Sequence, residues 1–447
     1  MRKVFKKTFL RRITSQSLNR FFNPAPALTK KTTPGMKLKI NSEIAALEAV
    51  IIHTPGTEVE NMTPKNAERA LYSDILNLSV AGEEYSQFSG VLKKTAKVYE
   101  VKDLLAESIT DTKARDSIIG KVAHGDDHLL TRLEMLDSQK LASALIEGLP
   151  IERNNLTKFL SKERFDLRPL HNFFFTRDAS VVIGESVLIG RMANKVRQRE
   201  AHIMNTIFEY HKDFNASILN PGNISDDCTA CRFEGGDILI VRDDIMLIGN
   251  GCRTSTEGID KIIEESIKFS EGKFHIIIQE LPLTPESFIH LDMVFTMLDT
   301  DLYMAYDPVI HKYNKYQTVK ITIDNKKVKS ITEVKNIPDA LKDLGMDMDA
   351  VICGSRNDSW TQEREQWHSG ANFFALEPGK VIGYLRNSHT LDELSSRGFE
   401  IITAGDLIEG RVSTDDYNKC VIGIEGSELA RGGGGARCMT MPLRRSE

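Results

Sequence analysis

One pattern in this sequence constrains the fold more than any other: a polar residue followed by two apolar strands with a tight turn between them. The pattern follows Asp178, Glu234-Gly-Gly-Asp237, His290-Leu-Asp292 and Asn372. The expected turns lie at Gly184-Glu185, at Asp243-Asp244, near Asp299 and at Pro378-Gly379. Alternating β-branched and apolar residues around Gly, Pro and Asp are typical of β-hairpins. The leading residues recur roughly every 55 to 80 positions, and Cys438 lies one further interval along the chain.

Helical segments lie between the hairpins. Their periodicity predicts helices over Lys195–Tyr210, Gly258–Phe269 and His389–Arg397. Strand pairs and helices that alternate at a long period favour an α/β fold built as a radial repeat, in which the leading polar residues converge on the axis. The alternative is a mixed α+β sheet whose hairpins resemble one another by chance.

The stretch from Asp103 to Leu167 lacks this pattern. It is charged, nearly free of strand signals and helical in period, as in KARDSIIGKV and LLTRLEML. We predict a helical subdomain at 103–167, inserted between the first and second modules. Such helices can lean on a neighbouring surface and contribute little to the chemistry.

The composition excludes several classes of protein. The chain has 447 residues, 41% of them hydrophobic and 27% charged, which is ordinary for a soluble globular protein. No apolar run reaches the roughly 18 to 20 residues that a membrane span needs, so we expect no membrane association. The net charge of -5 argues against nucleic acid as the main partner.

The N-terminal segment differs from the rest in charge. Residues 1–42 contain eleven Lys or Arg and no acidic residue, and their apolar side chains fall roughly on one helical face. This composition is typical of an organellar transit peptide, and the alternative is a disordered basic tail. We expect residues 1–36 to be a transit peptide for the mitochondrion or a related organelle such as the hydrogenosome. Without that role, the expected location is the cytoplasm.

The cysteines do not indicate a disulfide framework, because the chain has six in all. Cys228 and Cys231 form a single CxxC, which without a second ligand pair is weak evidence for zinc. A loop with two incidental thiols is the favoured interpretation.

Cys438 is the candidate nucleophile. It follows four consecutive glycines, Gly432–Gly435, and the apolar run MTMPL continues directly after it. An interior glycine loop allows close backbone approach to a ligand, whereas a flexible surface tail would not lead into a strand. His290 can serve as its acid and base, with Glu234 orienting the ring, although a lone His beside an apolar strand is more often structural.

Two further acids, Asp178 and Asp292, stand at equivalent positions of the repeat. Carboxylates gathered in one pocket repel one another unless a cation binds among them. One His and no second ligand pair at short spacing match zinc poorly, while calcium or magnesium is harder to exclude. A guanidinium fits better, because it is planar, permanently charged and able to form bidentate hydrogen bonds.

At these residues the sequence closely resembles the arginine deiminase family. The matching motifs run in family order from about Lys37 to the C-terminus: Asn172-Phe-Phe-Phe-Thr-Arg-Asp178, Arg191–Glu200, Glu234-Gly-Gly-Asp237, Gly251-Cys-Arg253-Thr, His290-Leu-Asp292, Thr296-Met-Leu-Asp299, Arg364-Glu-Gln-Trp, Pro378-Gly-Lys-Val-Ile-Gly-Tyr and Ala436-Arg-Cys438-Met-Thr-Met-Pro. The resemblance implies a catalytic domain at 37–447 with the pentein fold, a five-bladed pseudo-symmetric α/β propeller of ββαβ modules.

The resemblance also implies the activity and the role of each site residue. The family hydrolyses L-arginine to L-citrulline and ammonia through an amidino-cysteine intermediate, without metal or cofactor, as the first step of arginine catabolism by the deiminase pathway. The implied roles are nucleophile for Cys438, acid and base for His290 with Glu234 behind it, guanidinium binding for Asp178 and Asp292, α-carboxylate binding for Arg197, Arg253 and Asn172, and pocket lining for Phe175. A homo-oligomer, a dimer or larger, is the expected assembly.

The sequence departs from the family in one place. Some members carry an arginine within the glycine run, whereas Gly432–Gly435 is unbroken here, and neither Arg431 nor Arg437 is assigned its task. Two other functions stay open. One is a related guanidine hydrolase or amidinotransferase with the same Cys–His pair, and the other is an arginine-binding or structural protein that has lost turnover.

Overall fold

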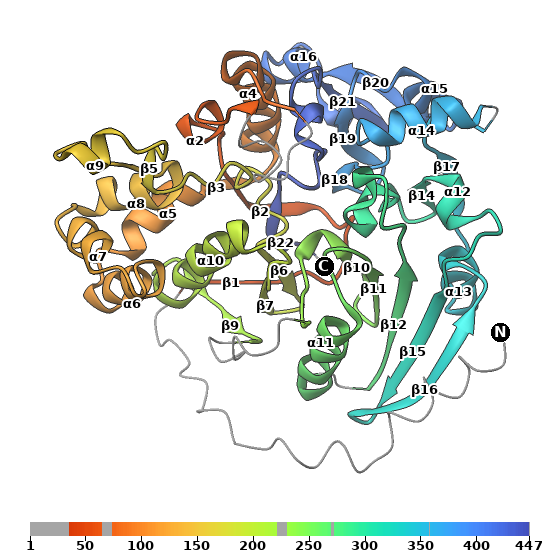
Figure 1. Ribbon diagram of the computed structural model, residues 1–447. Helices are drawn as coiled ribbons and strands as arrows, with labels where there is room; N and C mark the ends of the chain where they lie inside the picture. The colour runs from red at the N-terminus through yellow and green to blue at the C-terminus, as the bar shows by residue number, and fades with distance from the viewer. Residues whose placement is uncertain (1–34, 65–73, 221–229, 270–271, 357, 447) are drawn as a thin grey trace. The chain divides into compact units, whose positions relative to one another are not determined.

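The strands of the repeat form small sheets that share one pairing pattern (Figure 1). The computed structural model describes residues 35–446 except 65–73, 221–229, 270–271 and 357. Within that part of the chain, five sheets each contain an antiparallel pair whose second strand also pairs in parallel with a third strand. The described structure is therefore α/β, and its closure into a five-bladed ring stays a prediction.

The strands of the five sheets, in the order of this pattern, are β6 (Ser180–Ile183), β7 (Ser186–Ile189) and β9 (Ser217–Ile218); β10 (Ile238–Arg242), β11 (Ile245–Asn250) and β12 (Lys273–Glu280); β13 (Phe295–Met297), β14 (Leu302–Ala305) and β17 (Asp349–Ile352); β18 (Phe374–Glu377), β19 (Lys380–Tyr384) and β21 (Cys420–Ile424), with β20 (Glu400–Thr403) at its edge; and β22 (Met441–Arg445), β2 (Leu47–Ile52) and β3 (Lys97–Glu100). The four predicted hairpins are β6–β7, β10–β11, β13–β14 and β18–β19, and all four are confirmed.

The fifth sheet joins segments from distant parts of the sequence. β22, which contains the end of the MTMPL run, pairs antiparallel with β2, so that Ile51 lies opposite Met441. This pairing fixes the segment that carries Cys438 to the start of the domain.

Helices connect the parallel strands, because a parallel pair needs a crossover rather than a tight turn. The described helices outside the 103–167 region are α2 (Thr57–Glu60), α4 (Leu78–Thr95), α10 (Gln198–Tyr210), α11 (Thr256–Phe269), α12 (Asp307–Ile310), α13 (Ile337–Asp343), α14 (Ser359–Trp367), α15 (Ser388–Ser396) and α16 (Ala404–Ile408). The predicted helices correspond to α11, α15 and the η2–α10 segment, where η2 is a short 3-10 turn at Lys195–Arg197. None of the described helices has the length and apolar character that a membrane crossing requires.

The 103–167 region is largely helical, as its periodicity predicts. Its helices lie side by side in Figure 1: α5 (Val101–Ser108), α6 (Thr112–Val122), α7 (Asp127–Glu134), α8 (Ser138–Glu147) and α9 (Leu156–Phe159), with β4 (Leu149–Pro150) paired to β5 (Phe165–Leu167). Asp111, Asp126 and Asp137 begin α6, α7 and α8, and each side chain accepts a backbone hydrogen bond at the helix N-terminus. The boundaries of a separate subdomain stay a prediction.

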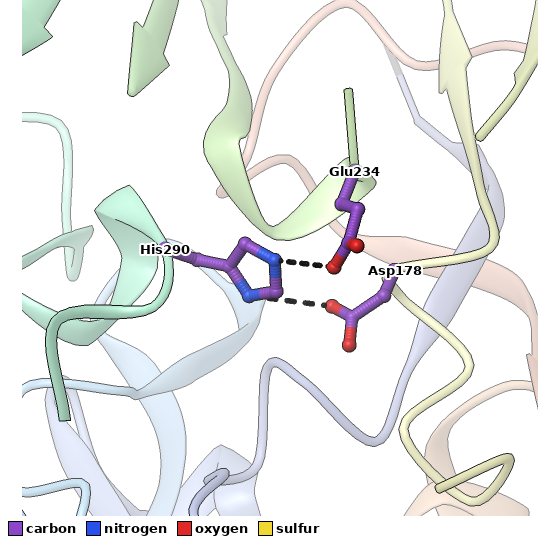
Figure 2. A group of neighbouring side chains, drawn as sticks. All are labelled: Asp178, Glu234 and His290. Carbon is purple, nitrogen blue, oxygen red and sulfur yellow. Dashed lines mark hydrogen bonds and ion pairs between the residues drawn. The ribbon is translucent and has the colours of Figure 1, made fainter. Parts of the chain in front are cut away.

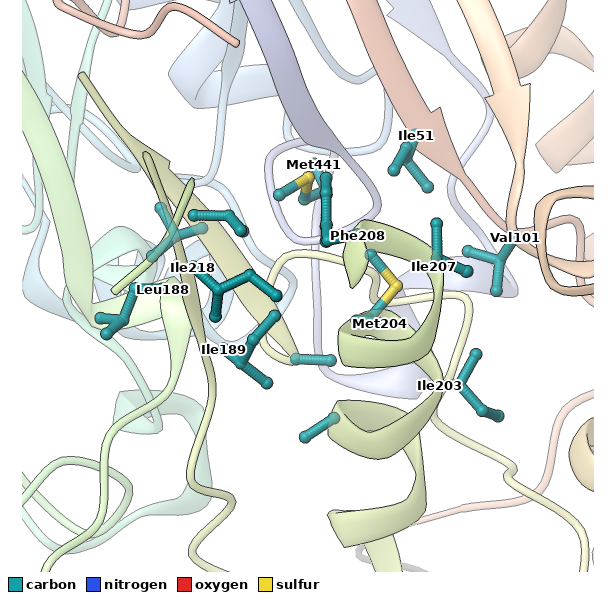
Figure 3. Packing of buried hydrophobic residues seen from close by; sticks show 14 of the residues in the cluster. Ile51, Val101, Leu188, Ile189, Ile203, Met204, Ile207, Phe208, Ile218 and Met441 are labelled. Carbon is teal, nitrogen blue, oxygen red and sulfur yellow. The ribbon is translucent and has the colours of Figure 1, made fainter. Parts of the chain in front are cut away.

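The core beneath these helices is continuous with the sheets (Figure 3). Ile203, Met204, Ile207 and Phe208 of α10 are buried in one cluster with Met441 of β22 and with residues of β2, β7 and α5. Burying an aliphatic or aromatic side chain contributes about 1.5 to 3 kcal/mol, so this contact anchors α10 and the η2 turn that precedes it.

One hairpin lies outside the predicted pattern. β15 (Thr318–Asp324) and β16 (Lys327–Val334) extend the second sheet, and the turn residues Asn325 and Lys326 have φ of 49° and 58°. Such values are typical of tight two-residue hairpin turns. The segment was not predicted because no polar residue of the repeat leads into it. A further pair, β1 (Met36–Lys37) and β8 (Phe214–Asn215), is parallel.

Two sequence predictions fall on residues that the structure does not describe. The proposed leader lies outside the described residues except for its end, and so does Cys228. Cys231 is described, and its side chain is buried.

Candidate active site

The predicted site residues lie where the strand pairs begin. Asp178 stands two residues before β6, and Glu234 precedes the 3-10 turn Gly235–Asp237 that leads into β10. His290 precedes a similar turn, Leu291–Met293, before β13, and Cys438 stands three residues before β22. Equivalent positions of different sheets thus bring side chains from distant segments together.

One pocket is lined by most of these residues. Six residues that the sequence predicted for the site line this pocket: Asn172, Phe175, Asp178, Arg197, Arg253 and Cys438. Ile289 and Gly432–Gly434 complete the lining. The remaining three predicted residues lie behind this lining. His290 contacts Asp178, Glu234 contacts His290, and Asp292 contacts Cys438.

His290 is held between two carboxylates (Figure 2). Its Nε2 lies 2.9 Å from Oε2 of Glu234, and its Nδ1 lies 3.5 Å from Oδ1 of Asp178. Burial alone would lower the pKa of His290, but Asp178, Glu234 and Asp237 raise it to about 9. Burial opposes ionisation of Glu234 too, but the hydrogen bond to His290 and the charges of Arg253, His290 and Arg197 lower its pKa to about 2. The ring is therefore an imidazolium at neutral pH.

Asp178, Glu234 and His290 offer ligand atoms within 4.8 Å of one another, a spacing that a metal ion could bridge. The neutral form of His290 has a lone pair for such an ion, whereas the imidazolium form has both ring nitrogens protonated. With a pKa of about 9, His290 itself supplies the positive charge that the two carboxylates need.

Cys438 is buried and flanked by a carboxylate. Its sulfur lies 3.7 Å from Oδ2 of Asp292 and 4.0 Å from Sδ of Met293. Burial raises the pKa of the thiol well above its usual value, and Asp292 and Asp178 raise it further. The thiol is thus protonated at neutral pH.

Asn372 also contacts the Cys438 thiol, and it was not among the residues predicted for the site. Its Nδ2 lies 3.3 Å from the Cys438 sulfur and donates to the backbone carbonyl of Asp292 at 3.0 Å. Its Oδ1 accepts from the backbone N–H groups of Arg437 and Cys438 at 2.9 and 3.2 Å. Asn372 occupies the leading polar position of the fourth hairpin, and that position was the signal that could have identified it.

The glycine run is explained by close approach to Phe175. A Cβ on Gly434 would lie 2.5 Å from the Phe175 ring, so no larger residue fits there without displacing the ring. Gly433 has φ of 81°, a conformation that favours glycine. The run is therefore an ordered wall of the pocket rather than a tail.

Arg197 lies against an acid of the site. Its Nη1 lies 2.6 Å from Oδ2 of Asp178, and its Nε and Nη2 donate to both oxygens of Glu200 at 2.8 to 3.1 Å. The sequence placed Arg197 on the substrate carboxylate, whereas here it pairs with a residue predicted to bind the guanidinium. Glu200, whose pKa burial raises to about 7 against the opposing charge of Arg197, was not predicted as a site residue. Arg253 lies beside Glu234, with Nη1 3.8 Å from Oε1.

The two arginines that flank the glycine run differ in environment. Arg431 is partly exposed and pairs with Glu428 and Asp74. Arg437 is buried and donates to Glu43 at 2.9 Å and to Asp292 at 2.8 Å. Asp292 therefore contacts both the Arg437 guanidinium and the Cys438 sulfur.

Comparison with known proteins identifies the family. The arginine deiminase family model matches residues 68–445. The chain is 32% identical over 430 residues to the arginine deiminase of Staphylococcus aureus strain JH9, an alignment that covers 92% of this chain and 98% of the relative. The chain belongs to the arginine deiminase family.

The resemblance seen in the motifs is thereby confirmed, and with it the class of enzyme, a hydrolase of carbon–nitrogen bonds in linear amidines. The arginine deiminase of Staphylococcus aureus strain Newman is 31% identical over 430 residues, which again cover 92% of this chain and 98% of the relative. Among solved structures, the N-terminal domain of ArgZ, an arginine dihydrolase from cyanobacteria, aligns with a TM-score of 0.49 at 15% identity over 89% of this chain and 98% of that chain. Dimethylarginine dimethylaminohydrolase aligns with a TM-score of 0.47 at 14% identity, over 89% of this chain and 99% of that chain.

Proposed function

We propose that this chain hydrolyses L-arginine to L-citrulline and ammonia through a covalent intermediate on Cys438. The observation that carries the proposal is a buried thiol beside carboxylates and an imidazolium in one site. A thiol flanked by negative charge is a poor nucleophile until a cation arrives. A substrate guanidinium is such a cation and keeps its charge at every physiological pH.

Substrate binding requires an exchange of partners. Asp178 and Asp292 hold the guanidinium, and Arg197, Arg253 and Asn172 hold the α-carboxylate, while Phe175 lines the pocket. Because Arg197 pairs with Asp178 in the present structure, the incoming guanidinium takes over that carboxylate and leaves Arg197 free for the substrate carboxylate. The bound cation also lowers the pKa of the Cys438 thiol, which then loses its proton to solvent.

The chemistry then follows from the protonation states. The Cys438 thiolate attacks the central guanidinium carbon, and a carbon–sulfur bond forms. His290, an imidazolium at neutral pH, donates its proton to the departing nitrogen as the carbon–nitrogen bond breaks and ammonia leaves. Neutral His290 next takes a proton from water, whose oxygen attacks the amidino-cysteine. Cleavage of the carbon–sulfur bond releases citrulline and restores the thiolate.

The test is a stoichiometric assay on the purified chain with L-arginine. Equal amounts of citrulline and ammonia are expected, and Cys438→Ser is expected to bind arginine without forming either product. Sustained turnover by that variant would exclude Cys438 as the nucleophile. Ornithine as the product, with the amidino group moved to an added amine, would instead identify an amidinotransferase, and binding without any product would identify an arginine-binding protein.

Three expectations from the sequence belong to the same proposal. The five sheets form a closed propeller whose axis passes through the site, the reaction opens arginine catabolism by the deiminase pathway, and residues 1–36 direct the protein to the mitochondrion or a related organelle. A fluorescent fusion of residues 1–42 tests the last of these. Retention of that fusion in the cytosol would rule out the targeting role.

A further inference from the structure

The hydroxyl of Tyr384 is bonded to the glycine run that lines the pocket. Tyr384 is the last residue of β19, and its side chain is buried. Its hydroxyl donates to the backbone carbonyl of Gly434 at 3.0 Å. Burial raises the pKa of Tyr384 well above its ordinary value, and the nearby Cys438 raises it further. The hydroxyl therefore keeps its proton and stays a donor at physiological pH.

The Tyr384 ring is held in place on its other side. A Cβ on Gly426 would lie 2.3 Å from Cδ1 of the ring, so the backbone of residue 426 lies directly against it. The Tyr384 backbone pairs with Ile424 of the neighbouring strand β21. The fourth sheet therefore fixes the position of the hydroxyl, and the hydroxyl fixes that of the Gly434 carbonyl.

Gly434 passes this position on to Phe175. Both residues line the pocket, and a Cβ on Gly434 would lie 2.5 Å from the Phe175 ring. Gly432 lies against the same ring, since its Cβ would be 3.2 Å from Cζ. The ring thus rests on the glycine run. Because protein interiors are close-packed, a shift of Gly434 moves the ring as well.

The hairpin that ends at Tyr384 begins beyond Asn372, which accepts from the backbone N–H of Cys438 at 3.2 Å. One hairpin thus holds both ends of the segment 434–438. Asn372 holds the end that carries the thiol, and Tyr384 holds the end that forms the pocket wall. The two contacts separate the placing of the nucleophile from the shape of the pocket.

We infer that Tyr384 is a positioning residue for substrate chain length, because it holds Gly434 against Phe175. The inference rests on the proposed function, in which the charged ends of arginine pair with charged residues. The methylenes between those ends then need apolar contacts, and Phe175 and Ile289 supply the large apolar side chains of the lining. One added methylene in such a pocket changes affinity about 10- to 200-fold, so a fixed wall distinguishes L-arginine from L-homoarginine.

The first test is binding of L-arginine and L-homoarginine, measured by calorimetry in the Cys438→Ser background. Adding Tyr384→Phe removes the hydroxyl and keeps the ring. The Kd for L-arginine should rise about tenfold, the effect of one lost hydrogen bond. The Kd for L-homoarginine should rise less than about threefold, because a loosened wall makes room for its extra methylene. Discrimination between the two ligands should therefore fall.

Tyr303→Phe in the same background is the matched control. Tyr303 is also buried, and its hydroxyl lies 2.8 Å from Nε2 of His311 in another sheet. Its removal should leave both Kd values within about twofold, since distant sites act independently. Thermal midpoints check the fold of both variants. An unchanged Kd for L-arginine in Tyr384→Phe, or an equal rise for both ligands, would overturn the inference.

The second test asks whether Tyr384 acts through the Phe175 ring. In a Phe175→Leu chain that ring is absent, so adding Tyr384→Phe should raise the KM for arginine less than about twofold. Fully additive effects of the two substitutions would overturn the inference. A wild-type chain that binds L-arginine without forming citrulline would refute only the proposed function, and the Kd values would still decide the role of Tyr384.

Discussion

The side-chain amide of Asn372 holds both the sulfur and the backbone N–H of Cys438, at 3.3 and 3.2 Å. One buried residue thus fixes the position of the Cys438 side chain and donates a hydrogen bond to its sulfur. Because Oδ1 also accepts from Arg437, the amide fixes the whole turn that follows the glycine run. A donor at the sulfur stabilises the thiolate that the reaction requires.

We expect Asn372→Ala to lower kcat about 100-fold, because small displacements of a nucleophile have effects of this size. Asn372→Asp keeps an acceptor for the two N–H groups but adds negative charge beside the sulfur. It should therefore fold like the wild type and still lose activity. Steady-state kinetics and thermal midpoints measure the two effects, and a wild-type kcat in the alanine variant would show that Asn372 has no positioning role.

The pKa of His290 predicts the alkaline limit of activity. The imidazolium that protonates the leaving nitrogen is populated below a pKa of about 9 and is lost above it. kcat/KM for arginine should accordingly fall as the pH rises through about 9. Glu234→Gln removes one of the charges that raise this pKa, so the limit should move to lower pH. The exposed Glu185→Gln variant is the matched control, and an unmoved limit in Glu234→Gln would contradict the assignment.

Alanine substitutions of Arg197 and Arg253 should differ in their effect on the KM for agmatine, a substrate that lacks the α-carboxylate of arginine. Arg253→Ala is expected to raise KM for arginine about 10- to 100-fold and to affect agmatine little, since it removes a charge-assisted hydrogen bond to the carboxylate. Arg197→Ala also frees Asp178 and should change the KM for both substrates. Equal effects of the two variants on agmatine would contradict this distinction.

Glu200 should affect arginine binding by positioning the side chain of Arg197. Its carboxylate has a pKa of about 7, so the pairing with Arg197 weakens as the pH falls through that value. KM for arginine is therefore expected to rise on acidification in the wild type. In Glu200→Gln the KM should be high and independent of pH in this range, whereas Glu200→Asp should partly retain the dependence. A wild-type pH profile in the glutamine variant would show that Glu200 does not position Arg197.

The Glu43–Arg437 pair should stabilise the fold. Burial opposes ionisation of Glu43, but Arg437 and the more distant arginines lower its pKa from 4.5 to about 2. The contribution to stability is present above pH 4.5 and is lost as the pH falls through about 2. Glu43→Gln should cost about 3 kcal/mol in urea unfolding at pH 7, because Arg437 loses a buried partner. Glu48→Gln, which breaks the exposed pair with Arg444, should cost less than about 1 kcal/mol.

Local structure was largely predictable from the sequence. The turns at Gly184-Glu185 and Pro378-Gly379 carry strong hairpin signals, and the polar residue before each hairpin indicated the site. The pairing of β2 with β22 was not predictable, because periodicity gives no information about which distant strands meet. For the same reason, Asn372 was recognised as a leading residue of the repeat but not as a neighbour of Cys438.

The pairing of Arg197 with Asp178 and Glu200 could not be predicted either. A motif assigns one role to a residue, whereas the charge balance of a pocket depends on which side chains face one another. Glu200 gave no signal of its own, since acidic residues in the first turn of a helix are common.

The pairing of β2 with β22 also has a consequence for the order of folding. Cys438 lies just before a strand whose partner comes from the opposite end of the described chain, and contacts between such distant segments form late. Before that sheet closes, β2 does not hold the segment that carries Cys438. We therefore expect activity to appear only after β2 and β22 have paired.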